Sequence, residues 1–331
     1  MGIPTVSGAI QFDDAYIYNP LVFCGTAGVI SIKDIDKQMS SGLKVIAVGG
    51  RTGRDGLHGA TFSSAALDTE SHEEDQQAVQ IGNPIEEKKA ADFVLAESLP
   101  ELQTLADLYE TEMTVLGESD GSGILKVTHH GETVCELDCS KLHEAPTRHL
   151  RANWTKKTAA VSSPKLDDPG KTLQQLLADF AVVSREPIIR EYDHEVQGNT
   201  VLKPLAGASG DAPQDAAVIR IDGSKKLMAM GLSILPEWGK TDPYAMGAAC
   251  VDECIRQLVL AGSNPDKIAI LDNFCVGNPE DETELGALVE TVKGIAAAAE
   301  AYGAPFVSGK DSFYNYFETD EGPVSIPTTI L

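Results

Sequence analysis

The residues best suited to chemistry begin with a glycine-rich stretch, Gly49 to Gly59, which reads Gly-Gly-Arg-Thr-Gly-Arg-Asp-Gly-Leu-His-Gly. An apolar run at residues 44–48 precedes it and predicts a buried strand that ends in a loop. The glycines allow sharp turns that bring backbone N–H groups close to an anion, and Arg51, Arg54 and His58 could add donors. Two interpretations stay open, an anion-binding loop and a solvated connection. A P-loop is excluded, because no Gly-Lys-Ser/Thr follows at the required spacing.

Two stretches in the C-terminal part place polar residues after predicted strands. Asp272 follows a strand predicted at residues 267–271, and Ser-Gly-Lys-Asp-Ser at residues 308–312 follows a strand predicted at residues 305–308. In α/β sheets, ligands collect beyond the carboxyl ends of strands. Phosphate or metal binding is therefore favoured over a turn-capping role for Asp272 and a plain surface position for Lys310.

A carboxylate and an amide lie four residues apart, at Glu253 and Gln257, on one face of a helix predicted at residues 242–260. That face is otherwise apolar, so an inward-facing carboxylate needs a partner. A magnesium ion shared with Asp215 would supply one. An ordinary exposed Glu/Gln pair is the alternative.

The predicted elements that position these residues alternate between strands and helices. Further helices are predicted at residues 99–109, 173–182 and 282–302, further strands at 21–24 and 113–116, and hairpins at 124–137 and 216–233. In the first hairpin, His129 and His130 are predicted to be turn residues rather than metal ligands, because neighbouring strand side chains point to opposite faces. The order predicts an α/β fold.

Composition narrows the function classes. The 331 residues suit roughly two domains. Fifty acidic against 26 basic residues give a formal charge of −24, which argues against nucleic-acid partners but not against a nucleotide ligand. No apolar run approaches the ~20 residues that span a bilayer, and no basic segment marks a secretory signal, so we expect no membrane partner and a cytoplasmic location. The six cysteines lack zinc-site spacing and are predicted to be buried thiols.

Longer motifs resemble one enzyme family. The stretch from Gly49 continues as Ala-Thr-Phe-Ser-Ser and is followed by Ala-Val-Gln-Ile-Gly-Asn-Pro from Ala78. Arg-Glu-Tyr-Asp-His-Glu-Val-Gln-Gly begins at Arg190, Asp-Pro-Tyr-Ala-Met-Gly at Asp242, and Gly-Asn-Pro-Glu at Gly277. With the Ser-Gly-Lys-Asp-Ser motif, these resemble, in order, the synthetase subunit of phosphoribosylformylglycinamidine (FGAM) synthase.

The resemblance implies a mixed-sheet α/β fold of AIR-synthetase-like modules, in which ATP-grasping-type N domains alternate with companion C domains. Residues 1–32 would end a first N-type domain, and residues 33–150 would form a C-type domain with its central part missing. Residues 151–199 would form a linker with a short helix, and residues 200–331 a second N-type domain.

The implied activity belongs to purine biosynthesis. The family uses ATP and Mg²⁺ to convert formylglycinamide ribonucleotide (FGAR) and ammonia to FGAM, ADP and phosphate. A glutaminase subunit supplies the ammonia, and a small accessory subunit completes the assembly.

The matched positions imply roles for individual residues. Gln80 and Ser312 match substrate-binding positions, and Asp272, Gly309 and Lys310 match nucleotide-binding ones. Lys310 stands where many small members have a metal-binding asparagine, a role a lysine cannot fill. Asp215, Glu253 and Gln257 match a metal trio at a second, non-catalytic nucleotide, with Gln257 in place of the usual asparagine.

Departures from the family pattern predict a fragment with an internal deletion. The catalytic histidines of the family have no match, and the sequence jumps between Lys89 and Ala90, where the family has metal-binding and substrate motifs. We therefore expect no turnover by this chain alone, and poor solubility or association, because a deletion leaves sheet edges and apolar faces uncovered. The alternatives are a non-catalytic nucleotide-binding or assembly remnant, and another member of the same superfamily, such as a selenophosphate or thiamine-phosphate enzyme.

Overall fold

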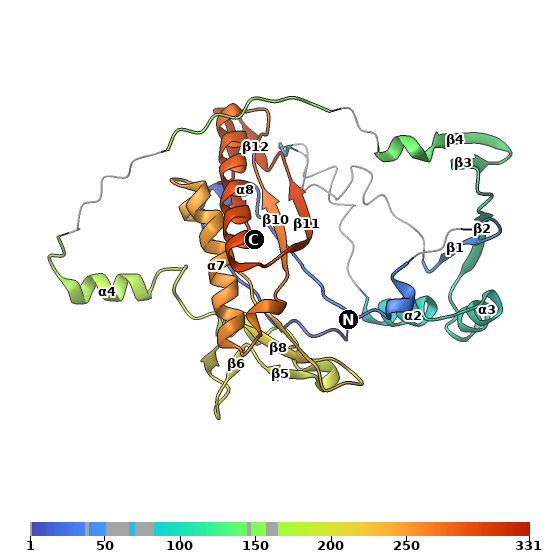
Figure 1. Ribbon diagram of the computed structural model, residues 1–331, viewed down its shortest axis with the longest axis horizontal. Coiled ribbons are helices and arrows are strands. Elements are labelled where there is room, and N and C mark those ends of the chain that lie inside the picture. The colour runs from blue at the N-terminus through green and yellow to red at the C-terminus, as the bar shows by residue number, and fades with distance from the viewer. Residues whose placement is uncertain (1, 37–39, 51–65, 70–82, 144–146, 157–164) are drawn as a thin grey trace. The chain divides into compact units, whose positions relative to one another are not determined.

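The computed structural model describes residues 2–36, 40–50, 66–69, 83–143, 147–156 and 165–331 (Figure 1). The chain divides into two compact units. Unit 1 comprises residues 1, 25–53 and 80–149, and unit 2 comprises residues 2–24, 54–79 and 150–331. The four-way domain assignment made from the sequence stays a prediction.

Unit 1 contains two small antiparallel pairs and two helices. Strand β1 pairs with β2, and β3 pairs with β4 as a hairpin. The elements are η2 (Ile32–Asp34), β1 (Lys44–Val48), α2 (Pro84–Val94), α3 (Leu99–Leu108), β2 (Met113–Glu118), β3 (Ile124–His129), β4 (Glu132–Asp138) and η5 (Cys139–His143). Helix α2 runs without interruption through Lys89 and Ala90, where the sequence departs from the family pattern.

Unit 2 begins with short elements and continues as a βα-type module. The first elements are η1 (Asp14–Tyr16), α4 (Pro169–Leu177), α5 (Glu186–Ile189), η6 (Val196–Gly198), β5 (Thr200–Leu202), β6 (Leu205–Ala206), β7 (Ala212–Pro213), β8 (Ala217–Arg220) and β9 (Leu227–Met230). They are followed by α6 (Pro236–Gly239), α7 (Pro243–Leu260), η7 (Pro265–Lys267), β10 (Ile270–Cys275), α8 (Glu282–Tyr302), β11 (Phe306–Ser312), β12 (Tyr316–Thr319), β13 (Gly322–Ser325) and β14 (Thr329–Ile330).

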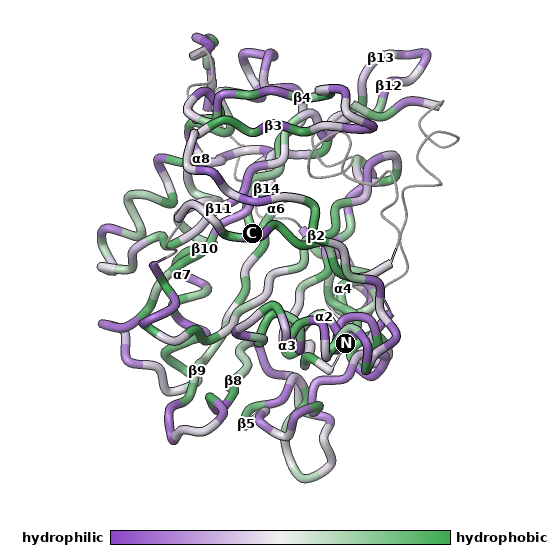
Figure 2. The backbone as a smooth tube through the Cα atoms, turned by 90° about the vertical axis from the view of Figure 1, so that its right-hand side faces the viewer, coloured by the Kyte–Doolittle hydropathy of each residue, from purple (hydrophilic) through white to green (hydrophobic). Residues whose placement is uncertain are grey.

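The described residues of unit 2 form four small sheets, one of which is the antiparallel β6–β7 pair. Strands β5, β8 and β9 form one antiparallel sheet, and β12 pairs with β13, whose connecting turn is hydrophilic (Figure 2). The third sheet has the order β11-β10-β14, with β10 parallel to β11 and antiparallel to β14. The result is the mixed α/β fold expected from the sequence.

The main core of unit 2 lies where α7 and α8 pack side by side against the third sheet (Figure 1). Met246, Cys250 and Ile255 of α7 meet Ile295 of α8 and Ile330 of β14 in one buried cluster. Two glycines let the helix backbones approach closely. A Cβ at Gly247 would lie 2.6 Å from the Thr291 carbonyl oxygen, and one at Gly294 would lie 2.1 Å from that of Tyr244.

The N-terminal segment of unit 2 forms hydrogen bonds with residues from the C-terminal half of the chain. The Thr5 amide donates to the Asp193 carbonyl (2.9 Å), and the Arg185 guanidinium donates to the Ile10 carbonyl (3.2 Å). The Tyr16 hydroxyl bonds to Thr329, which belongs to β14 at the far end of the chain. These contacts tie residues 5–16 to the C-terminal module.

Several predicted elements differ from the structure. Residues 21–24 form no strand, and Val22 is 88 % exposed, so this apolar run has no sheet to join. Strand β10 starts three residues later than predicted and continues through Asp272 to Cys275, while β11 extends to Ser312. The polar motifs expected in loops therefore lie within strands, because pairing between β10 and β11 continues through them. The helix at 282–302 and both hairpins are confirmed. Residues 44–48 form the predicted strand, but its side chains are exposed or half-buried rather than buried, because among the described residues β1 pairs with β2 alone. The helix predicted at 173–182 lies at Pro169–Leu177.

Candidate functional site

The polar residues predicted at the two strand ends face each other across β10 and β11. From Leu271 onward the register is regular: Asp272 pairs with Gly309, Asn273 with Lys310, and Cys275 with Ser312. Because successive strand side chains point to opposite faces, these pairs divide between the two sides of the sheet. Asp272 and Gly309 share one side, whereas Lys310 and Ser312 share the other.

Asp272 lies on the side of the sheet that α7 and α8 cover, since Ile270 and Phe274, two residues away on either side, pack into the helical core. A Cβ at Gly309 would lie 2.2 Å from the Asp272 Oδ1 atom, so a side chain at position 309 would force this carboxylate to move. Burial raises the pKa of Asp272, and the nearby charge of Asp311 acts in the same direction. The Asp272 carboxylate is thus partly shielded from water and lies directly beside the backbone of Gly309.

The opposite side of the sheet carries a cationic and hydroxyl pair. The Lys310 ammonium donates to the Ser312 hydroxyl (2.6 Å) and to the Asp311 carbonyl (3.1 Å). Ser312 is buried, whereas Lys310 is exposed. The residues predicted to contact nucleotide and substrate, Lys310 and Ser312, are thereby brought together, and a phosphate oxygen is the kind of acceptor such a pair can hold.

Buried polar groups surround this pair, and the sequence motifs did not single them out. Asn273 is 2 % exposed; its amide nitrogen donates to the Cys275 sulfur (3.1 Å), while its Oδ1 atom accepts no hydrogen bond from the described residues. The Asn315 amide donates to the Ser312 carbonyl (2.7 Å). Burial raises the pKa of the Cys275 thiol to about 11, so it stays protonated at neutral pH.

Tyr16 and Thr329 close this side of the sheet. The Thr329 hydroxyl donates to the Pro327 carbonyl (2.7 Å), so it accepts the hydrogen bond from Tyr16. Burial raises the pKa of Tyr16 to about 12, and Thr329 is fully buried beside Cys275 in β14. Because these residues are 313 positions apart, no local sequence signal could have paired them.

The predicted metal trio is only partly brought together. On α7, the Ser233 hydroxyl donates to the Glu253 carboxylate. The Gln257 amide bonds the Leu232 backbone twice, its Oε1 accepting from the N–H (3.0 Å) and its Nε2 donating to the carbonyl (3.1 Å). Asp215 is exposed just before β8.

The Gln257 Oε1 atom, which would have to ligate a shared magnesium ion, already accepts one hydrogen bond from the Leu232 amide. Within the described ranges no three His, Cys, Asp or Glu side chains lie close enough to hold a metal. The metal role of the trio stays a prediction.

Other predicted positions lie outside the described residues. These are the anion-loop residues Arg51, Arg54 and His58 and the substrate position Gln80. At the β3–β4 turn, the His129 and His130 rings are 4.1 Å apart, and His130 has a positive φ of 49°. Among the helices that the structure describes, none has the length and apolar character needed to cross a membrane.

Comparisons with known proteins place this geometry in a family. Residues 213–331 match the model described as AIR synthase related protein, N-terminal domain. The chain is 31% identical over 391 residues to the phosphoribosylformylglycinamidine synthase subunit PurL of Methanothermobacter thermautotrophicus, covering 96% of this chain and 53% of the relative. It spans about half the length of the curated relatives it matches.

Solved structures share the fold. PurLQS from Thermotoga maritima matches with a TM-score of 0.67 and 18% identity, covering 99% of this chain and 60% of that one. T. maritima PurL complexed with FGAR matches with a TM-score of 0.62 and 21% identity, covering 89% and 55%. At these identities the likeness shows a common architecture.

Fold and sequence together define a mixed α/β protein that carries an AIR-synthase-related N-terminal domain in its C-terminal third. The chain is similar over nearly its whole length to curated PurL subunits of phosphoribosylformylglycinamidine synthase, and the resemblance noted in its motifs is confirmed. The 391 aligned positions exceed the 331 residues of the chain by 60, so the relative has residues within the aligned region that this chain lacks.

Proposed function

We propose that this chain is a PurL-type component of FGAM synthase that contributes nucleotide- and substrate-binding residues to the reaction. In that reaction ATP phosphorylates the formyl amide oxygen of FGAR, ammonia attacks the activated carbon, and phosphate leaves to give FGAM and ADP. The observation that carries the proposal is the alignment of 96% of the chain with a PurL subunit.

Described residues on both sides of the β10–β11 pair would contribute to binding. Asp272, beside the bare backbone of Gly309, would accept hydrogen bonds from the nucleotide. Lys310 and Ser312 would donate to phosphate oxygens of nucleotide and substrate, and their mutual hydrogen bond orients both donors. Gln80 would complete the substrate contacts.

Three further parts of the proposal rest on the family alone. Mg²⁺ would neutralise phosphate charge, with Asp215, Glu253 and Gln257 as candidate ligands once Gln257 releases Leu232. A glutaminase subunit and a small accessory subunit would be the partners, and the location would be cytoplasmic. Support for an assembly comes from the likeness to T. maritima PurLQS.

We expect the chain to lack turnover by itself, because its sequence jumps between Lys89 and Ala90, where the family pattern has metal-binding and substrate motifs. The test supplies the purified chain with FGAR, Mg-ATP and ammonium and follows amidine formation and phosphate release. Turnover near that of a full-length PurL subunit would overturn this part of the proposal.

A second function, nucleotide binding without catalysis, is favoured by one observation. The segment matched to the AIR-synthase-related domain contains the helical core and both paired motifs. Calorimetry with Mg-ADP distinguishes this function from an inert chain.

A further inference from the structure

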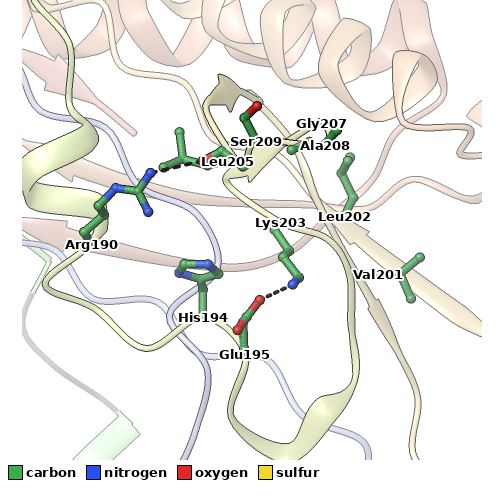
Figure 3. Close-up of a pocket in the computed structure, with 12 residues that line it drawn as sticks. Arg190, His194, Glu195, Val201, Leu202, Lys203, Leu205, Gly207, Ala208 and Ser209 are labelled. Atoms are coloured by element: carbon green, nitrogen blue, oxygen red, sulfur yellow. Dashed lines mark hydrogen bonds and ion pairs between the residues drawn. The ribbon is translucent and has the colours of Figure 1, made fainter.

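Unit 2 contains a cavity of about 570 Å³ between the residues that follow α5 and the β6–β7 hairpin (Figure 3). Its polar lining comes from Arg190, His194, Glu195 and Lys203, and its small-residue wall comes from the loop 207–210. Arg190 and His194 belong to a motif of the resemblance that has no role in the proposed reaction. The proposed reaction therefore assigns no ligand to this cavity.

Two cationic side chains, Arg190 and Lys203, bring hydrogen-bond donors to this cavity. The Arg190 guanidinium pairs with Glu186 through Nε (2.7 Å) and Nη2 (2.6 Å), and Nη2 also donates to the Gly210 carbonyl (3.2 Å), which leaves its Nη1 donors available. Lys203 stands on another wall and forms one ion pair, with Glu195. His194 has a buried Nδ1 atom without a hydrogen-bond partner among the described residues.

The loop of residues 207–210, Gly-Ala-Ser-Gly, is shaped by two left-handed glycines. Gly207 has a φ of +85° and Gly210 a φ of +61°, conformations that residues with a side chain rarely adopt. The Gly210 amide closes the turn on the Gly207 carbonyl (3.2 Å). The hydrogen bond from Arg190 holds the loop against the cavity. Turns with left-handed residues can form anion-binding concavities from successive backbone N–H groups.

The rest of the lining is apolar and comes from Val201, Leu202, Leu205 and Ala206. A wall of this kind suits the carbon skeleton of a small molecule, and a volume of this size exceeds the needs of a lone anion. Only one lining residue, Glu195, carries a carboxylate, although the whole chain has a formal charge of −24. Each of the two lining cations is paired with a carboxylate, Arg190 with Glu186 and Lys203 with Glu195, so the charges around the cavity are balanced, unlike those of the whole molecule.

We propose that this cavity binds a phosphate monoester of a small organic molecule. The phosphate lies against Arg190, Lys203 and the loop 207–210, and the organic part lies against Leu202 and Leu205. Charge-assisted bonds from Arg and Lys are the strong ones that phosphate oxygens accept. This site is separate from the β10–β11 pair, so it does not depend on the proposed function.

The test is calorimetric titration of the full chain at low ionic strength with ribose 5-phosphate, with inorganic phosphate, and with ribose as the uncharged control. We expect ribose 5-phosphate to bind more tightly than inorganic phosphate, and ribose to give no heat. Arg190→Gln and Lys203→Gln should each weaken ribose 5-phosphate binding by about tenfold, the loss of one charge-assisted hydrogen bond.

A matched control is available on α7. Arg256 pairs with Asp252 four residues before it, as Arg190 pairs with Glu186, and it does not line the cavity. Arg256→Gln removes the same charge and should leave binding within about twofold. Glu195→Gln frees Lys203 and removes the cavity's carboxylate, so it should strengthen binding several-fold, which a purely structural role would not produce.

The proposal is overturned if ribose 5-phosphate gives no heat at millimolar concentration with folded protein. It is equally overturned if Arg256→Gln weakens binding as much as Arg190→Gln does, because a general charge effect would then explain the result. If Arg190→Gln does not fold, Lys203→Gln and Glu195→Gln decide: unchanged affinity in both removes the site.

Discussion

Asp272 and Gly309 occupy paired positions on parallel strands, and the Asp272 carboxylate lies where a side chain at position 309 would have to sit. The separation from a Cβ built on Gly309 to Asp272 Oδ1 is only 2.2 Å. A side chain at position 309 would displace the Asp272 carboxylate, so the two residues act as one feature of the candidate nucleotide site.

The first prediction follows from that clash. Gly309→Ala should push the Asp272 carboxylate out of place, at a stability cost of about 1–2 kcal/mol, and should reduce the rise in Tm that Mg-ADP gives. Gly8→Ala is the control, because a Cβ there meets no atom within 4 Å. Equal Mg-ADP protection of both variants would argue against a nucleotide role for this pair.

The second prediction concerns the two hydrogen bonds between the Gln257 side chain and the Leu232 backbone. Gln257→Ala should lower the free energy of unfolding by about 1–3 kcal/mol in EDTA, because it leaves the Leu232 N–H and carbonyl without their partner. Urea unfolding measures this difference. A loss that appears only when Mg²⁺ is present would instead assign Gln257 to the metal.

The third prediction is a pH dependence centred on Tyr16. Burial raises the pKa of Tyr16 in the folded chain to about 12, above its ordinary value of about 10, so the folded state holds this proton more tightly than the unfolded state does. The resulting stability is fully present below pH 10 and is lost as the pH rises toward 12, a change of about 2–3 kcal/mol.

Comparison with Tyr16→Phe isolates this contribution from the other groups that titrate in the same range. The variant should be less stable at pH 8, where the hydrogen bond to Thr329 is lost, and the gap should narrow by pH 12. Parallel stability curves for the two proteins between pH 9 and 12 would show that Tyr16 does not carry the effect.

The fourth prediction is self-association through unit 1. Its strands and helices expose large apolar side chains, among them Val45 (53 %), Val94 (84 %) and Leu116 (67 %). An apolar hollow of about 370 Å³, lined by Ile46 and Phe93 among others, lies beside them. Uncovered apolar surface of this kind drives association, so light scattering at micromolar concentration should show species larger than one chain. A monodisperse monomer with a cooperative melt would count against uncovered surface and the internal deletion together.

Local signals were enough to predict much of unit 2. Helix α8 starts at an aspartate cap, Asp281, which accepts from the amides of Thr283 and Glu284, and it ends at Gly303 with a φ of 65°. The residues directly before and after the helix determine where it starts and ends, so the range predicted from the sequence matches the observed helix. The hairpin predicted at residues 216–233 is likewise local, since Asp222-Gly223, a pair typical of tight hairpin turns, lies between β8 and β9.

Long-range contacts could not be predicted in the same way. The polar residues Asp272 and Asn273 looked like a loop, yet pairing with β11 and β14 keeps them in a strand. The spacing of Glu253 and Gln257 predicted a shared helix face but not that Leu232 would satisfy the amide. Such partners are set by tertiary structure, which overrides local preference.

Calorimetric titration of the folded chain with Mg-ADP tests the central claim, that this PurL homologue binds nucleotide at Asp272. We predict saturable binding by the unmodified chain and at least about tenfold weaker binding by Asp272→Asn, because a charged hydrogen-bond acceptor is lost. No heat at millimolar nucleotide with folded protein, or equal affinity of the two proteins, would contradict it.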